Sequence, residues 1–114
     1  MISVKFEKTD KDTIVFTCEG HAGQAEKGQD IVCASASMLA YTLAQNLLFL
    51  QDKGIFRGNP RVMLKDGNAH ISCRPKKASM GEVLHTFFVV QVGYSLLAHN
   101  YPQYVALTMF GKTE

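Results

Sequence analysis

Apolar and polar residues alternate in four short segments of the chain, a pattern that is typical of β-strands with one buried face. Over residues 2–8 every second side chain is apolar, and residues 13–19 repeat the pattern after the turn-forming residues 9–12. Residues 61–65 and 69–74 form a second pair, separated by an Asp-Gly-Asn turn sequence. Since a short polar turn between two alternating runs favours a hairpin, we predict two β-hairpins.

Two longer segments have apolar residues at helical spacing instead. The first follows Asp30, contains no charged residue as far as residue 51, and ends near Gly54. Its apolar stripe comprises Leu39, Leu43, Leu47 and Leu50. The second helix is predicted between Ser79, its expected N-cap, and Asn100, with the stripe Val83, Phe87, Val90, Tyr94 and Leu97. Spacings of three and four residues place such side chains on one helix face. A last strand is expected over residues 103–110.

The predicted order is β-β-α-β-β-α-β, which indicates an α+β fold. We expect one domain over residues 1–114, with two long helices packed on one face of a mixed β-sheet. A chain of 114 residues can bury a sufficient core without metal or disulfides. Both helices contain too many polar residues for a membrane span, so we expect no membrane partner. We expect them to be buried in the domain, or partly by a second copy of it.

Charge is distributed unevenly along the chain. The net charge is only +2, yet residues 53–77 carry seven lysines and arginines against Asp66 alone, a net charge of +6. This basic segment is either a solvated face or a docking surface for an anionic partner such as RNA or a ribosome. The three cysteines are an odd number, and the N-terminus lacks a secretory signal pattern. We therefore expect a cytoplasmic protein with reduced thiols.

Cys33 is the best candidate for a reactive group. If Asp30 caps the first helix, Cys33 lies in its first turn, where free amides and the helix dipole favour a thiolate. His21 lies twelve residues earlier, beside glycines that allow the chain to turn back. A cysteine and a histidine are the minimal set for thiol nucleophilic catalysis. The alternative is that Cys33 is an ordinary core residue, since cysteines in apolar helices are usually buried.

A paired motif resembles the signature of the ribosomal-processing cysteine protease family, known as Prp. The motif is Gly20-His21-Ala22-Gly23 followed by Gly28-Gln29-Asp30-Ile31-Val32-Cys33-Ala34. The resemblance covers the whole chain, including its length and element order. It implies a cytoplasmic bacterial homodimer that removes the N-terminal extension of a large-subunit ribosomal protein, L twenty-seven. By position, Cys33 would be the nucleophile and His21 the base, with no cofactor.

The remaining site residues would support this chemistry. Amides near Cys33 and Ala34 are the expected donors to the oxyanion. Asp30 either caps the helix or orients His21, as in a catalytic triad. The loop that contains Gly23 and Gly28 is expected to be flexible and to become ordered on substrate. Met38 could line an apolar groove for the substrate extension.

Two other functions compete with proteolysis. Cys18 with His21, and His70 with Cys73, have spacings found in zinc sites. However, His70 and Cys73 would point to opposite faces of one strand, and Cys18 shares a face with apolar residues, so we predict no metal. The second alternative is a non-enzymatic RNA- or ribosome-binding protein that uses residues 53–77. The chain has no aromatic-interleaved RNA motif to support it.

Overall fold

The alternating segments form one mixed sheet in the computed structural model, which describes residues 1–9, 12–26 and 30–113. The strands lie in the order β3-β4-β2-β1-β5-β6, with β1 parallel to β5 and the other neighbours antiparallel. They are β1 (Ile2–Lys8), β2 (Ile14–Glu19), β3 (Arg61–Lys65), β4 (Asn68–Cys73), β5 (Val105–Met109) and β6 (Lys112–Thr113). Both predicted hairpins are present.

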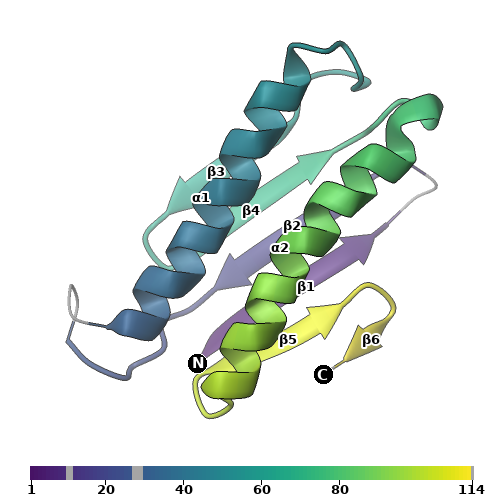
Figure 1. Cartoon of the computed structure of the whole chain (residues 1–114). Helices are drawn as coiled ribbons and strands as arrows, with labels where there is room; N and C mark the ends of the chain where they lie inside the picture. Colours follow the sequence, from purple (N-terminus) through teal and green to yellow (C-terminus); the bar gives the residue numbers. More distant parts are fainter. Residues whose placement is uncertain (10–11, 27–29, 114) are drawn as a thin grey trace.

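Two antiparallel helices cover one face of this sheet, as Figure 1 shows. They are α1 (Ile31–Gln51) and α2 (Met80–Asn100), the second preceded by the 3₁₀ helix η1 (Lys77–Ser79). All five residues of the predicted α2 stripe are buried. The buried face of α1 differs from its leucine stripe, because three alanines share it with Val32, Leu43 and Leu47. These small side chains are Ala36, Ala40 and Ala44.

The core is centred on an aromatic cluster beneath the helices. Phe6 and Phe16 are opposite each other in the β1–β2 register, and Tyr94 of α2 lies within 6.0 Å of both ring centroids. The Tyr94 hydroxyl donates a hydrogen bond of 2.6 Å to the carbonyl of Ala36. A buried hydroxyl that has a partner avoids the cost of desolvation, so this bond fixes α2 against α1. Leu39 also packs directly over Gly93, where an added Cβ would lie 2.7 Å from its side chain.

The α+β fold and the order of its main elements are confirmed. Two details differ from the sequence expectation. Strand β6 was not predicted, because two residues paired to β5 are too short to show a period. Ser79 occupies the N-cap position of α2, but among the described residues its side chain makes no capping hydrogen bond. Its backbone is held instead by η1, through the bond from its amide to the carbonyl of Lys76.

The outer faces of the helices remain strongly apolar. Contrary to the expectation from their polar residues, two helical segments are long and apolar enough to cross a membrane by length and composition alone. Their mean hydropathy is 1.4 over Ile31–Gln51 and 1.2 over Lys77–Asn100. In this fold their inner faces cover the sheet, while large apolar side chains point outward. The most exposed are Phe49, Met38, Leu96, Ile31, Val89, Phe88 and Tyr41.

Candidate active site

Asp30 fixes the start of α1. Its carboxylate oxygen Oδ1 accepts hydrogen bonds of 3.0 Å from the amides of Val32 and Cys33. This confirms Asp30 as the N-cap, with the extended backbone that such a residue adopts. The other oxygen, Oδ2, accepts from the amides of Gln24 and Ala25, at 3.0 and 3.4 Å. One carboxylate therefore joins the helix start to the preceding loop.

The same hydrogen bonds determine the charge of Asp30. The Cys33 amide, followed by those of Ala25, Gln24 and Val32, holds the pKa of this carboxyl below its ordinary value. Asp30 is therefore ionised at neutral pH, although its side chain is buried. All its identified partners are backbone amides, so the structure gives no bond to support the alternative that Asp30 orients His21.

Cys33 is the third residue of α1 and is half-buried. Its Sγ accepts a hydrogen bond of 3.3 Å from the amide of Ala22 in the preceding loop. This N–H is directed at the sulfur, which also lies near the positive end of the α1 dipole. Ala22 is itself buried, which holds this donor in place.

His21 lies directly after the turn at the end of β2. Three contacts position it: the Gly20 amide donates to the Gly67 carbonyl at 2.9 Å, the Met1 amino group donates to the His21 carbonyl at 2.6 Å, and the imidazole packs against Gly67. A Cβ on Gly67 would lie 2.5 Å from His21 Nε2, so only glycine leaves room for the ring. Gly67 also has a φ of +72°, which favours glycine.

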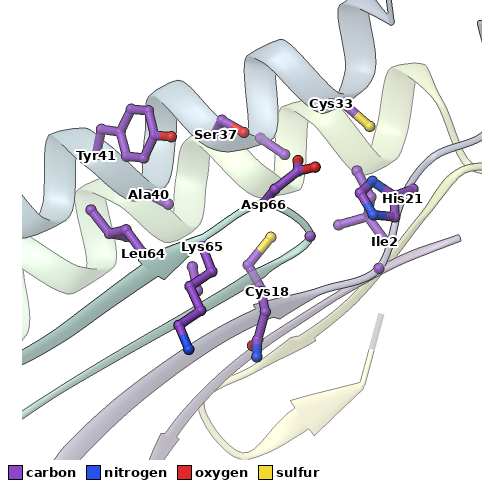
Figure 2. Close-up of a pocket in the computed structure, with 15 residues that line it drawn as sticks. Ile2, Cys18, His21, Cys33, Ser37, Ala40, Tyr41, Leu64, Lys65 and Asp66 are labelled. Atoms are coloured by element: carbon purple, nitrogen blue, oxygen red, sulfur yellow. The ribbon is translucent and has the colours of Figure 1, made fainter. Parts of the chain in front are cut away.

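His21 and Cys33 open onto one pocket of about 170 Å³ (Figure 2). Its walls come from the end of β2, the first three turns of α1 and the β3–β4 turn. Apolar or small side chains form much of the lining, including Ile2, Cys18, Ala36, Ala40, Leu64 and Ala69. Ser37 adds a hydroxyl one helical turn after Cys33, and Lys65 and Asp66 add charges. A peptide segment with an apolar side chain would suit this cavity.

The structure brings some of the predicted site residues together and not others. Cys33 and His21 line one pocket, whereas the amides near Ala34, which were expected to serve the oxyanion, already have partners. The Ala34 amide already donates to the Asp30 carbonyl at 3.0 Å, and the Cys33 amide is held by the carboxylate. Gly23 lies in the loop with a φ of +72°, whereas Gly28 lies outside the described residues. Met38 lines a different, shallow groove on the outer face of α1.

The contribution of the β3–β4 turn was missed from sequence. Its Asp-Gly-Asn sequence indicated a turn correctly. The close approach to His21 depends on β4 pairing with β2, a contact between residues about 50 positions apart. The only local signal was the glycine at position 67, which many turns share.

The other two cysteines have a different environment from Cys33. Burial raises the pKa of the Cys18 thiol to about 11 and that of Cys73 to about 12, so both are neutral thiols at pH 7. His70 is exposed on the opposite face of β4 from Cys73, as predicted. Within the described ranges, no three histidine, cysteine or carboxylate residues are grouped so that they could hold a metal ion.

Known proteins share both the sequence pattern and the fold. The sequence matches the family described as cysteine protease Prp over residues 1–106. The chain belongs to this family. A search of curated proteins finds no match.

Several solved protein structures have the same fold, two of them of a Prp protease. The ribosomal processing protease Prp from S. aureus, in complex with a covalently linked product peptide, is 23% identical with a TM-score of 0.71. The alignment covers 96% of this chain and 99% of that one. The same S. aureus protease with a substrate peptide gives a TM-score of 0.68 at 23% identity and the same coverage. SMU.848 from Streptococcus mutans is 27% identical, with a TM-score of 0.66 and 96% and 94% of the chains covered.

We predict that Asp30→Ala destabilises this Prp-family member in a pH-dependent way. The pKa of Asp30 in the folded protein lies below its unfolded value of about 3.9. Its full contribution to the free energy of unfolding is therefore present above that pH. The contribution is lost as pH falls through the folded pKa. The melting temperature of Asp30→Ala should be below that of the wild type at pH 7, and the difference should narrow below about pH 4. Asp52→Ala, at the exposed other end of α1, is the control. An equal difference at pH 3 and pH 7 would contradict this role.

We also predict that Gly67→Ala displaces the His21 imidazole. The matched control is Gly54→Ala, since Gly54 has a similar φ of +67° but no atom within 4 Å of an added Cβ. Both variants should lose stability from backbone strain, whereas only Gly67→Ala should shift the His21 ring resonances in an NMR spectrum. Unchanged His21 resonances in a folded Gly67→Ala protein would show that the ring does not rest on this glycine.

Proposed function

We propose that this protein is a cysteine endopeptidase in which Cys33 is the nucleophile and His21 transfers protons. The observation that carries the proposal is that both side chains open onto one pocket, with the sulfur at a capped helix start. The Ala22 amide donates to that sulfur. Membership of the cysteine protease Prp family supports the same reaction class.

The proposed reaction has two steps. The Cys33 sulfur attacks the scissile carbonyl carbon while His21 takes up the thiol proton. The imidazolium then gives that proton to the leaving amine as the C–N bond breaks, which leaves a thioester on Cys33. In the second step, water loses a proton to His21 and attacks the thioester carbon. The C–S bond then breaks, His21 returns the proton to the Cys33 sulfur, and the carboxyl product is released.

The oxyanion formed during attack needs a donor other than the first helical amides. Ser37 is placed for this role, because it follows Cys33 by four residues, lines the same pocket and is exposed. Residues four positions apart lie on one face of a helix. Its hydroxyl therefore replaces the Ala34 amide in the proposed mechanism.

We infer that the substrate is the N-terminal extension of a large-subunit ribosomal protein, L twenty-seven, processed in the bacterial cytoplasm. The S. aureus protease of the same fold is described as a ribosomal processing protease and was solved with a substrate peptide. The partly apolar pocket beside Cys33 is consistent with an extended segment carrying apolar side chains. The three free cysteines are consistent with a reducing compartment.

The variants Cys33→Ala and His21→Gln test this function directly. Each protein is incubated with the precursor of the ribosomal protein, and the products are measured by mass spectrometry. Cys33→Ala should abolish cleavage. His21→Gln should reduce cleavage by about 10²- to 10⁴-fold, the usual contribution of acid–base catalysis, because the amine must leave with a proton.

Iodoacetamide labelling of Cys33 separates a catalytic histidine from a structural one. In folded His21→Gln, alkylation should change only modestly, since the sulfur keeps its place at the helix start and its hydrogen bond from the Ala22 amide. His85→Gln, on α2, is the matched control and should leave both reactions unchanged. Cleavage by Cys33→Ala, or near-wild-type cleavage by His21→Gln, would refute the assignment.

We further propose that the protein is a homodimer that covers the outer faces of the helices. Phe49 is 67% exposed, Met38 63% and Leu96 61%, which is more apolar surface than a monomer usually presents. Light scattering at micromolar concentration should give twice the chain mass of 12.6 kDa. Phe49→Glu should reduce that mass towards the monomer, and Lys5→Glu, on the opposite face of the sheet, should not. A monomeric wild type would contradict the proposal.

A further inference from the structure

A cluster of arginines lies at the end of the sheet opposite the Cys33 pocket. Arg57 follows the C-terminal end of α1, and Arg74 follows β4. The backbone holds them together, since the Arg57 amide donates to the Arg74 carbonyl at 2.7 Å and Phe56 forms a bridge with Pro75. Phe56 is buried, which anchors this connection in the core. The two guanidinium groups therefore project from a fixed backbone.

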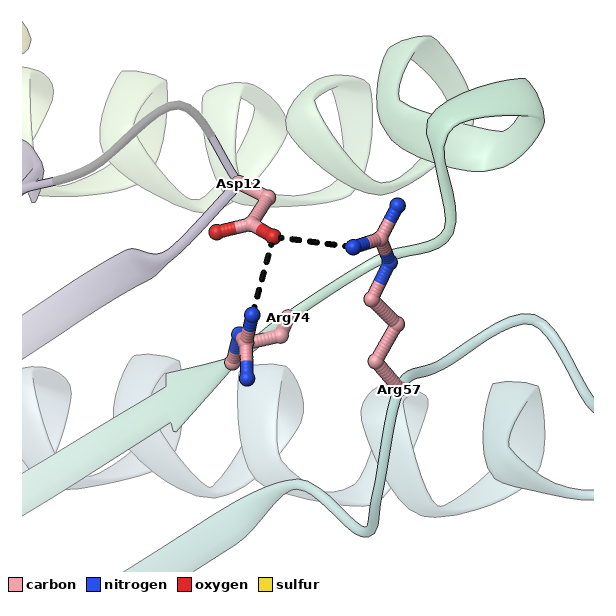
Figure 3. A network of polar contacts seen from close by, with 3 residues as sticks. All are labelled: Asp12, Arg57 and Arg74. Carbon is pink, nitrogen blue, oxygen red and sulfur yellow. Dashed lines mark hydrogen bonds and ion pairs between the residues drawn. The ribbon is translucent and has the colours of Figure 1, made fainter.

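A single carboxylate lies between these guanidinium groups (Figure 3). Asp12 Oδ2 is 3.1 Å from Arg74 Nη2 and 3.4 Å from Arg57 Nη1. The hydrogen bond from Arg74 holds the pKa of Asp12 below its ordinary value, so the carboxylate is ionised. One negative charge thus faces two positive ones. Each guanidinium has five N–H donors and uses one nitrogen here, and both side chains are about half exposed.

A hollow beside this pair adds further donors. Arg61, the first residue of β3, lines it together with both other arginines. The hydroxyls of Thr13 and Ser72 and the amide of Asn59 also line it. Three cations against Asp12 leave a net charge of about +2, and rigid guanidinium forks match the oxygens of phosphate groups.

The basic surface continues along the edge of the sheet. Arg61 is opposite Ser72 in the β3–β4 register, and Lys65 is opposite Asn68. By strand alternation both belong to the face away from the helices, because Val62 beside Arg61 is opposite the fully buried Ile71. Lys65, at the far end of β3, also lines the Cys33 pocket. The four residue steps from Arg61 to Lys65 span about 13 Å along the strand. Basic groups that extend from the arginine cluster to Lys65 fit a polyanion better than they fit a single small anion.

We propose that this arginine cluster, formed by Arg57, Arg61 and Arg74, binds the phosphate backbone of single-stranded RNA. The site is independent of peptide cleavage, because the 21 residues of α1, about 30 Å, separate it from the Cys33 end. Contacts are made to phosphates rather than bases, so binding is strongly salt-dependent and insensitive to sequence.

The test is fluorescence anisotropy with a labelled 20-nucleotide oligouridylate between 50 and 200 mM KCl. Each phosphate contact on a single strand contributes about 0.7 to the salt slope. Arg74→Gln should therefore reduce the slope by about 0.7 and the affinity by about fivefold at 0.1 M. Arg61→Gln, outside the ion pairs with Asp12, should act similarly and provides a second variant if the first loses stability. Lys5→Gln makes the same charge change on β1 and should leave binding unchanged.

Peptide cleavage is measured in parallel, and both Arg74→Gln and Arg61→Gln should cleave as the wild type does. This separates a failure of RNA binding from a failure of the proposed protease function. Wild-type protein that fails to bind the RNA would overturn the proposal. So would folded arginine variants that bind as the wild type does, or a loss of affinity in Lys5→Gln equal to that in Arg74→Gln. Polyglutamate that binds more tightly than RNA would overturn it as well and would assign the cluster to an acidic protein.

Discussion

The carboxylate of Asp30 is the interaction on which the rest of the candidate active site depends. It accepts hydrogen bonds from two amides at the start of α1 and from two in the loop before it. This gives α1 a defined first turn, where Cys33 lies. It also holds the loop that carries the Ala22 amide, which donates to the Cys33 sulfur. The negative charge of this carboxylate is stabilised by the four N–H dipoles that are directed at it.

The side of the pocket formed by the β3–β4 turn depends on a close approach of the turn backbone to His21. The β3–β4 turn contacts His21 only because position 67 lacks a side chain, and the turn is tied to β2 by the bond between Gly20 and Gly67. On the helix side, Ala36 and Ala40 leave space that larger residues would fill. The pocket therefore exists because small residues from three separate segments meet at one end of the sheet.

Much of the fold could be predicted from sequence because its elements have clear periods. The alternation in β1 and β2 and the stripe on α2 identified their buried faces, and Asp30 was a recognisable cap. Long-range contacts could not be predicted in this way. The pairing of β4 with β2 places Gly67 beneath His21, and the bridge between Phe56 and Pro75 joins Arg57 to Arg74. The partners of the first helical amides could not be predicted in this way either: the Asp30 carbonyl accepts from the Ala34 amide, and the Asp30 carboxylate accepts from the Cys33 amide.

Hydrogen exchange measured by NMR tests the central claim most directly. If one carboxylate binds both segments, the amides of Gln24, Ala25, Val32 and Cys33 exchange slowly in the wild type. In Asp30→Ala all four should exchange faster together, while amides in the middle of α2 stay protected. Exchange at Gln24 and Ala25 that is as fast in the wild type as in Asp30→Ala would contradict the account, because the loop would then not be held by Asp30.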